Sequence, residues 1–249
     1  SLDDGVTLGT DLARINRILI KPGMGIRGFS QALLRPEWSS EPLRFVGIRL
    51  DDIAHADPRR QEQNLSLVID RIETLGINGV IVSPFTADLN AVFFQNRQLP
   101  VKADLLNRFL QQVRDRTQVR HTFLELPAAM PLADVDELYA ELMRRAGWFR
   151  GVVFNSATST EQRTRLQGLF RSQRPTAKLG VIYKPGEAFP GADFALIDVD
   201  SGLSEQALTA AGAEAAASGS DRVFVRVMNT PETDARRLAR TLLILNATG

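Results

Sequence analysis

The sequence predicts an α/β protein, a (β/α) TIM-type barrel that is incomplete or distorted and contains about seven strands. Three observations support this prediction. Short apolar runs alternate with longer segments at helical spacing, polar or acidic residues follow most of the runs, and 249 residues suit one barrel. With one strand fewer than the usual eight, we expect a strand to be lost or supplied by the N-terminal segment.

The alternative is an open, doubly wound parallel sheet. Nucleotide-binding versions of that fold carry a glycine-rich phosphate loop after a strand, and no predicted strand is followed by one. The barrel is therefore the favoured interpretation.

The amino-acid composition disfavours several classes of function. A net charge of +1 gives no field that would favour nucleic acid or membranes, and no apolar run reaches membrane-spanning length. Cysteine is absent, and His55 and His121 are the only histidines, which disfavours a zinc site or a Ser-His-Asp triad. We expect no cofactor and no metal.

Residues 1–42 show no regular pattern, so we expect a connector from a preceding domain, with the barrel occupying residues 43–249. The LDDG sequence at Leu2–Gly5 resembles the metal-binding aspartate motif of polysaccharide deacetylases. That chemistry also needs a downstream histidine pair on one helical face, which this chain lacks. We therefore still interpret residues 1–42 as a connector.

The first strand–helix unit is the clearest in the chain. Arg44–Leu50 alternates as a buried strand and leads directly into Asp51 and Asp52. Asp57 is placed to cap a helix over Arg59–Leu75. Binding groups in such folds sit where strands end, so this unit predicts the position of a site.

The same alternation continues to the end of the chain. Only about ten residues separate the fifth and sixth strands, too few for a helical crossover, so a loop is expected there. The further predicted strands are Asn78–Ser83, Val119–Glu125, Arg150–Phe154, Lys178–Tyr183, Phe194–Ile197 and Arg222–Met228. The further predicted helices are Ala103–Arg116, Asp134–Ala146, Thr160–Phe170, Ser204–Ala217 and Pro231–Leu245.

The carboxyl ends of the strands form one rim in a barrel, and five carboxylates are expected there. Such a rim suits a cationic or hydroxyl-rich ligand, although acids after strands often only cap the next helix. Asp51 with Glu125, or Asp51 with Asp198, is a candidate for the carboxylate pair that a glycosidase needs. The predicted rim comprises Asp51, Asp52, Ser83, Glu125, Asn155, Ser156, Tyr183, Lys184, Asp198, Asp200 and Asn229.

Several stretches resemble a known family. Asp57–Val80 and Phe93–Val119, with the preceding FVGIRLDD, are similar to the C-terminal domain of the periplasmic poly-N-acetylglucosamine N-deacetylases of biofilm systems. The N-R-x-L-P motif at Asn96–Pro100 is the most specific piece, and DGVTLGTDLARINRILI resembles the connector that leaves their deacetylase domain. Beyond Gly151 the resemblance is weak.

The resemblance implies a (β/α) barrel that binds the partly deacetylated polymer and, in several members, cleaves it as a glycoside hydrolase. It also implies a location in the periplasm or at the periplasmic face of the outer membrane. The implied partners are a glucosamine-containing polysaccharide, a preceding deacetylase domain and an outer-membrane export porin.

The departures from the family pattern point to lost catalysis. The family's first strand ends in H-x-D-L-D-Y, and here only the second aspartate survives, as Asp51. Arg49 would share a strand face with Asp51 and lower its pKa. The family's F-H-D-D reads Phe154, Asn155, Ser156, Ala157 in this chain.

Three functions remain open. The favoured one is a catalytically degenerate carbohydrate-binding or scaffold domain, and the others are an active glycoside hydrolase and a purely structural module. No catalytic residue is expected; an active enzyme would use Asp51, Glu125 and Asp198. The predicted carbohydrate-binding residues are Asp51, Asp52, Asn96, Arg97, Glu125, Asn155, Asp198 and Asp200.

Overall fold

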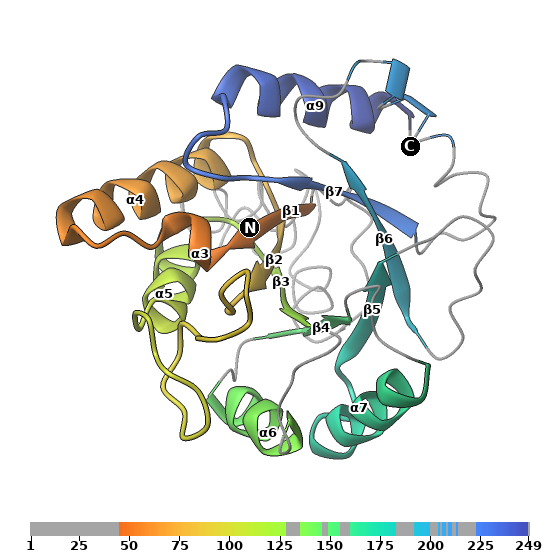
Figure 1. The fold of residues 1–249 in the computed structure, drawn as a ribbon. Helices are drawn as coiled ribbons and strands as arrows, with labels where there is room; N and C mark the ends of the chain where they lie inside the picture. The colour runs from red at the N-terminus through yellow and green to blue at the C-terminus, as the bar shows by residue number, and fades with distance from the viewer. Residues whose placement is uncertain are drawn as a thin grey trace, which may run out of the picture. The chain divides into compact units, whose positions relative to one another are not determined.

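A computed structural model of the chain contains a closed barrel of seven parallel strands with helices around the outside (Figure 1). Each strand pairs with the next, and β7 pairs with β1 to close the ring. The predicted fold class is confirmed. The structure describes residues 45–127, 135–145, 149–154, 160–182, 192–199, 204, 206–207, 209–210, 213 and 223–248.

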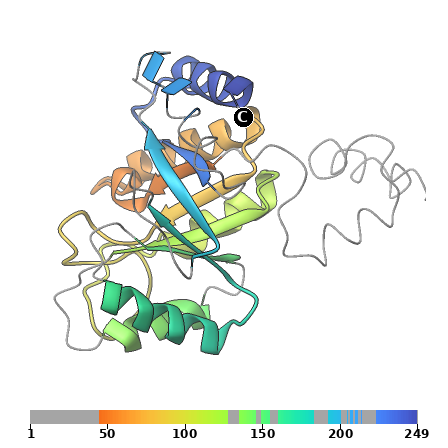
Figure 2. The ribbon, with the colours of Figure 1, turned by 90° about the vertical axis from the view of Figure 1, so that its right-hand side faces the viewer.

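The observed strands match the predicted ones within a few residues. Figure 2 shows the barrel from the side, with β6 running diagonally across the ring. The strands are β1 (Phe45–Arg49), β2 (Gly79–Ser83), β3 (His121–Leu126), β4 (Gly151–Phe154), β5 (Lys178–Ile182), β6 (Phe194–Val199) and β7 (Val223–Met228).

The helices follow the strands, as the alternating pattern predicts. Asp57 caps α4, where its Oδ1 accepts a hydrogen bond from the Arg59 amide at 2.9 Å. Gly76, just after the helix, has φ of 63°, a conformation that glycine adopts without strain. The helices are α3 (Leu50–Ile53), α4 (Pro58–Thr74), α5 (Leu106–Arg116), α6 (Val135–Arg145), α7 (Thr160–Gln173) and α9 (Ala235–Thr248).

Three boundaries differ from the prediction in ways that affect the site. β1 ends at Arg49, and the short α3 turns Asp51 and Asp52 away from the strand direction. β6 extends to Val199 instead of ending at Ile197, so that Asp198 lies within the strand.

The last helix also starts later than predicted. It begins at Ala235 instead of Pro231, because the Asp234 carboxylate accepts the Arg237 amide at 2.9 Å and caps the helix there. The predicted helix Ser204–Ala217 falls largely outside the described residues.

The interior of the barrel is filled at its amino-terminal end by four phenylalanine rings. Phe45 lies 5.9 Å from Phe123 and 5.5 Å from Phe224 between ring centroids, and Phe123 lies 5.0 Å from Phe194. Edge contacts of this kind add to the hydrophobic stabilisation from burial. The rings close this end, so open space is left at the carboxyl end of the strands.

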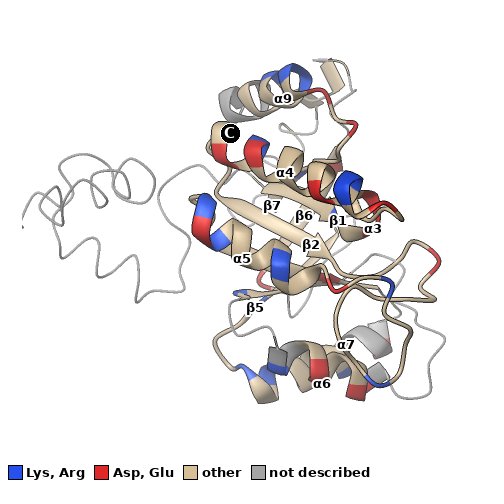
Figure 3. Ribbon diagram, turned by 90° about the vertical axis from the view of Figure 1, so that its left-hand side faces the viewer, with Lys and Arg blue, Asp and Glu red and all other residues tan. Residues whose placement is uncertain are grey.

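Alternate strand residues point outward and form the second part of the core. Val46 and Ile48 of β1 pack with Val80 and Val82 of β2 against the helices. Charged residues lie on the outer faces of α4 and α5 (Figure 3), where the Arg108 guanidinium pairs with Glu62 at 2.6 Å. No helix among the described residues is both long and apolar enough to cross a bilayer.

His121 is a buried residue of β3 and lies within the predicted strand Val119–Glu125. Burial lowers its pKa to about 4, and the positive charges of Arg150 and Arg120 contribute in the same direction. An unfolded chain would titrate this side chain near its ordinary value of 6.5. Between these two values the unfolded state binds a proton that the folded state does not, so acid destabilises the fold.

We expect the free energy of unfolding to fall by about 2 kcal/mol between pH 7 and pH 5 because of His121 alone. Urea unfolding of the wild type and of His121→Gln at both pH values measures it. The variant should lose less stability than the wild type over this interval. An equal loss in the two proteins would contradict the assignment.

Gly180 of β5 lies against the interior phenylalanines. A Cβ at this position would overlap the ring of Phe194, which is fully buried and cannot move aside. We therefore expect Gly180→Ala to destabilise the protein by about 1–3 kcal/mol in urea unfolding. Gly168→Ala on the exposed face of α7 is the control: its Cβ meets nothing within 4 Å, and we expect about 0.5–1 kcal/mol of stabilisation. Equal effects of the two substitutions would contradict this packing.

Candidate functional site

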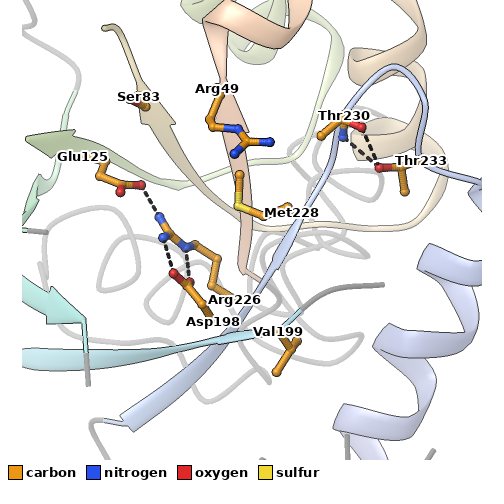
Figure 4. Close-up of a pocket in the computed structure, with 9 residues that line it drawn as sticks. All are labelled: Arg49, Ser83, Glu125, Asp198, Val199, Arg226, Met228, Thr230 and Thr233. Carbon is orange, nitrogen blue, oxygen red and sulfur yellow. Dashed lines mark hydrogen bonds and ion pairs between the residues drawn. The ribbon is translucent and has the colours of Figure 1, made fainter. Parts of the chain in front are cut away.

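A cavity of about 550 Å³ opens at the carboxyl end of the strands (Figure 4). Its volume lies within the range of small-ligand sites, about 300–1,000 Å³. The side chains come from inward-facing positions of β1, β2, β3, β6 and β7 and from the loop after β7, except for Val199, which points to the other face of β6. They are Arg49, Ser83, Glu125, Asp198, Val199, Arg226, Met228, Thr230 and Thr233.

Arg226 is the central residue of the cavity, and its side chain is only 3% exposed. Its Nε and Nη2 donate to the two carboxylate oxygens of Asp198 at 2.6 and 2.8 Å, and its Nη1 donates to Glu125. Burial acts to lower the pKa of Arg226, but the hydrogen bonds and charges of Asp198 and Glu125 outweigh it and raise the pKa. The guanidinium is thus permanently charged, and each of its three nitrogens donates to a carboxylate.

The sheet register brings this ion-pair cluster together. Asp198 of β6 lies directly opposite Arg226 of β7, so both side chains point to the same face of the sheet. Glu125 reaches the guanidinium from β3, across the barrel. The three residues carry a net charge of −1, and the side chain of Asp198 remains 44% exposed.

Arg49, the last residue of β1, also lines the cavity. Its side chain is 54% exposed, and its Nε donates to the Asp52 carboxylate at 2.8 Å. The prediction that Arg49 would act on Asp51 is therefore corrected. The α3 turn breaks the strand alternation on which that prediction rested, and brings Asp52 to Arg49 instead.

Asp51 lies outside the lining of the cavity and fastens the loop after β2. Its Oδ1 accepts from the Lys102 ammonium at 2.8 Å, and its Oδ2 accepts from the Ala87 amide at 3.0 Å. Lys102 in turn lies 5.9 Å from the centre of the Phe93 ring. In the structure Asp51 joins both ends of one loop to α3.

Hydroxyl groups line the side of the cavity next to β7. The Thr230 and Thr233 hydroxyls lie 3.0 Å apart, and the Thr230 amide donates to the Thr233 hydroxyl at 3.0 Å. Arg71 of α4 holds this turn by donating to the carbonyl oxygens of Thr230 and Pro231. Asn229, predicted at the rim, is instead buried and donates to the Val68 carbonyl at 3.3 Å.

The side chain of Asn96 is occupied within its own loop. It donates to the carbonyl oxygens of Phe94 and Leu99 and accepts the amides of Gln98 and Leu99. The N-R-x-L-P motif therefore has a structural reason, because Asn96 organises the turn. Neither Asn96 nor Arg97 is among the described residues that line the cavity.

The predicted rim is thus brought together only in part. Glu125, Asp198 and Ser83 line the cavity, whereas Asp51 and Asp52 make ion pairs elsewhere. A binding role for the predicted residues stays a prediction. Five further predicted positions lie outside the described residues, namely Asn155, Ser156, Tyr183, Lys184 and Asp200.

Sequence reasoning missed Arg226. The signal was present: an arginine at an inward position of the apolar strand Val223–Met228 must meet carboxylates or be expelled from the core. Phe93 and Phe94 are buried in the core and offer no ring surface for stacking on a sugar.

The two described carboxylates that line the cavity are both hydrogen-bonded to one arginine. Both oxygens of Asp198 and one oxygen of Glu125 accept hydrogen bonds from Arg226. Glycoside hydrolysis needs one carboxyl group to donate a proton and a second to remain ionised. Among the described residues no cluster of three or more metal-ligating side chains occurs.

A closed parallel barrel with polar groups gathered at the strand ends defines the class of (β/α) barrels. Residues 47–134 match the model of a family described as GHL13, hypothetical glycosyl hydrolase family 13. The barrel is similar to the PgaB (BpsB) glycoside hydrolase domain from Bordetella bronchiseptica, with a TM-score of 0.60 and 18% identity. The alignment covers 84% of this chain and 92% of that domain, and at this identity it shows the fold.

Two curated relatives share sequence with about half of the chain. They are the poly-beta-1,6-N-acetyl-D-glucosamine N-deacetylases of Escherichia coli K12 and O157:H7, each 28% identical over 124 residues. The match covers 48% of this chain and only 18% of either relative. The predicted resemblance to the C-terminal, glycoside-hydrolase-like domain of PgaB-type N-deacetylases is confirmed.

We expect Arg226→Met to lower the free energy of unfolding by about 3–5 kcal/mol, because it leaves two carboxylates in the barrel without their counter-charge. Urea unfolding at neutral pH measures the loss. The matched control is Arg165→Met on α7, which removes a pair to Asp136 from an arginine that is 61% exposed, and it should cost less than about 1 kcal/mol.

A triple variant tests whether unpaired charge is the cause of the lost stability. Arg226→Met combined with Glu125→Gln and Asp198→Asn has no unpaired charge in the cavity, and it should recover much of the lost stability. A loss for Arg226→Met no larger than for Arg165→Met would contradict the buried ion-pair cluster as described.

Proposed function

We propose that the barrel binds partly deacetylated poly-N-acetylglucosamine at its carboxyl-end cavity and does not cleave it. The observation that carries this proposal is that, among the described residues, both carboxylates that line the cavity, Glu125 and Asp198, are hydrogen-bonded to the buried Arg226. Hydrolysis requires a carboxyl proton donor, whereas binding requires only complementary shape and charge.

The net charge of the ion-pair cluster and the exposure of Asp198 favour a partly deacetylated polymer as the ligand. The cluster of Arg226, Asp198 and Glu125 keeps one net negative charge, and Asp198 is open to the cavity. A glucosamine unit carries a protonated amine, which this carboxylate would attract. Hydroxyl groups of Ser83, Thr230 and Thr233 suit the hydroxyls of the sugar.

We further propose which larger protein the barrel belongs to, from its similarity to the poly-N-acetylglucosamine N-deacetylases. The barrel would be the second domain of a periplasmic poly-N-acetylglucosamine N-deacetylase, with residues 1–42 as the connector from its deacetylase domain. Its cellular role would lie in biofilm exopolysaccharide modification and export, beside an outer-membrane porin. The similarity to the Escherichia coli N-deacetylases supports this setting.

Calorimetry with partly deacetylated β-1,6-glucosamine oligomers tests the binding. We expect measurable affinity that weakens as salt increases, and a loss of about tenfold in Asp198→Asn, because a charge-assisted hydrogen bond becomes a neutral one. The matched control is Asp136→Asn, an ion-paired acid of similar exposure on α6, which should bind like the wild type.

Product sizes after long incubation at high protein concentration test the absence of hydrolysis. Unchanged oligomer length is expected. Shortening that disappears in Glu125→Gln would replace the proposal by an active glycoside hydrolase. The absence of both heat and shortening would leave a structural module.

A further inference from the structure

We propose that Arg49 is the specificity-determining residue of the cavity and that it binds the acetamido oxygen of an N-acetylated sugar unit. The inference rests on the proposed function, because it concerns the same cavity and polymer. It adds a second requirement to the amine-binding carboxylate: the bound segment must also carry an acetyl group.

The donors of Arg49 are only partly used. Its Nε donates to Asp52, which is not among the described cavity-lining residues, and no described residue accepts a hydrogen bond from its Nη1 or Nη2. The side chain is 54% exposed, and Figure 4 shows its guanidinium within the cavity, near Met228. The N–H groups of these two nitrogens thus have no acceptor among the described residues, and this fixed, planar cation can donate them to a ligand.

Arg226 cannot take this role. Its Nε, Nη1 and Nη2 are all hydrogen-bonded to Asp198 and Glu125, and its side chain is 3% exposed. Of the two arginines that line the cavity, only Arg49 presents donors to an incoming group.

The chemistry of a guanidinium selects the substituent. It donates hydrogen bonds, accepts none and is always charged. An acetamido carbonyl is a good acceptor for it, whereas a protonated amine offers no acceptor and carries a like charge. Removing the acetyl group at this position therefore exchanges a hydrogen bond for repulsion.

The cavity thus has donors on one side and an exposed acceptor on the other. Arg49, Thr230 and Thr233 contribute donors from β1 and the loop after β7, and Asp198 offers carboxylate oxygens from β6. A polymer that is only partly deacetylated can satisfy both sides, because it carries acetamido groups and amines along one chain.

The test pairs one substitution with one change in the ligand. Calorimetry measures wild-type protein and Arg49→Gln with β-1,6-linked oligomers of equal length that are fully acetylated, partly deacetylated or fully deacetylated. Arg165→Gln is the matched control, since Arg165 is likewise exposed and paired to an acid at 2.8 Å.

We expect the wild type to bind the partly deacetylated oligomer most tightly. Arg49→Gln should lose about tenfold affinity for the two acetyl-bearing oligomers and lose nothing for the fully deacetylated one. Arg165→Gln should match the wild type with all three. This coupling between side chain and acetyl group is what a merely structural pair with Asp52 would not produce.

Equal weakening with all three oligomers would overturn the role of Arg49 and leave the proposed binding intact. Tightest binding of the fully deacetylated oligomer by the wild type would do the same. Binding of no oligomer by the wild type would overturn the proposed function, and the role of Arg49 with it.

Discussion

The buried guanidinium of Arg226 is the constraint on which the site depends. An unpaired charge inside a barrel costs several kcal/mol, so this arginine is tolerated only where carboxylates surround it. Asp198 meets it because β6 and β7 are in register, and Glu125 meets it from the far side of the ring. The hydrogen bonds that compensate the buried charge of Arg226 are also the hydrogen bonds of Asp198 and Glu125. The stability of the interior and the chemistry of the cavity therefore depend on the same contacts.

Periodicity and local capping predicted most of the fold because both are properties of short segments. The capping role of Asp57 and the end of the helix it caps depend on residues within a few positions, and the predicted cap was confirmed. The short α3 and the two extra residues of β6 were missed. Asp51 and Asp52 read equally well as the end of a strand or the start of a turn, and the length of β6 is set by pairing with β7, which lies beyond a local window.

Much of the site could not be predicted for a related reason. The partners of an ion pair are chosen by tertiary distance, and Asp51 lies 51 positions from Lys102 in sequence, whereas Glu125 lies 101 positions from Arg226. Strand order did predict that Glu125 and Asp198 share a rim. Strand order did not predict that an arginine from a third strand would lie between them. It also did not predict that the side chain of Asn96 would form its hydrogen bonds within its own loop.

A ligand cavity and acid–base chemistry depend on different features of a barrel. The cavity exists because four phenylalanine rings fill only the amino-terminal end of the interior, and small residues such as Gly180 make room for them. Catalysis would require in addition a carboxyl group with a transferable proton. In this cavity both oxygens of Asp198 and one oxygen of Glu125 accept hydrogen bonds from the buried Arg226, and Asp198 and Arg49 both retain exposed polar atoms. The ion pairs that keep Arg226 buried are therefore compatible with ligand binding in the same cavity.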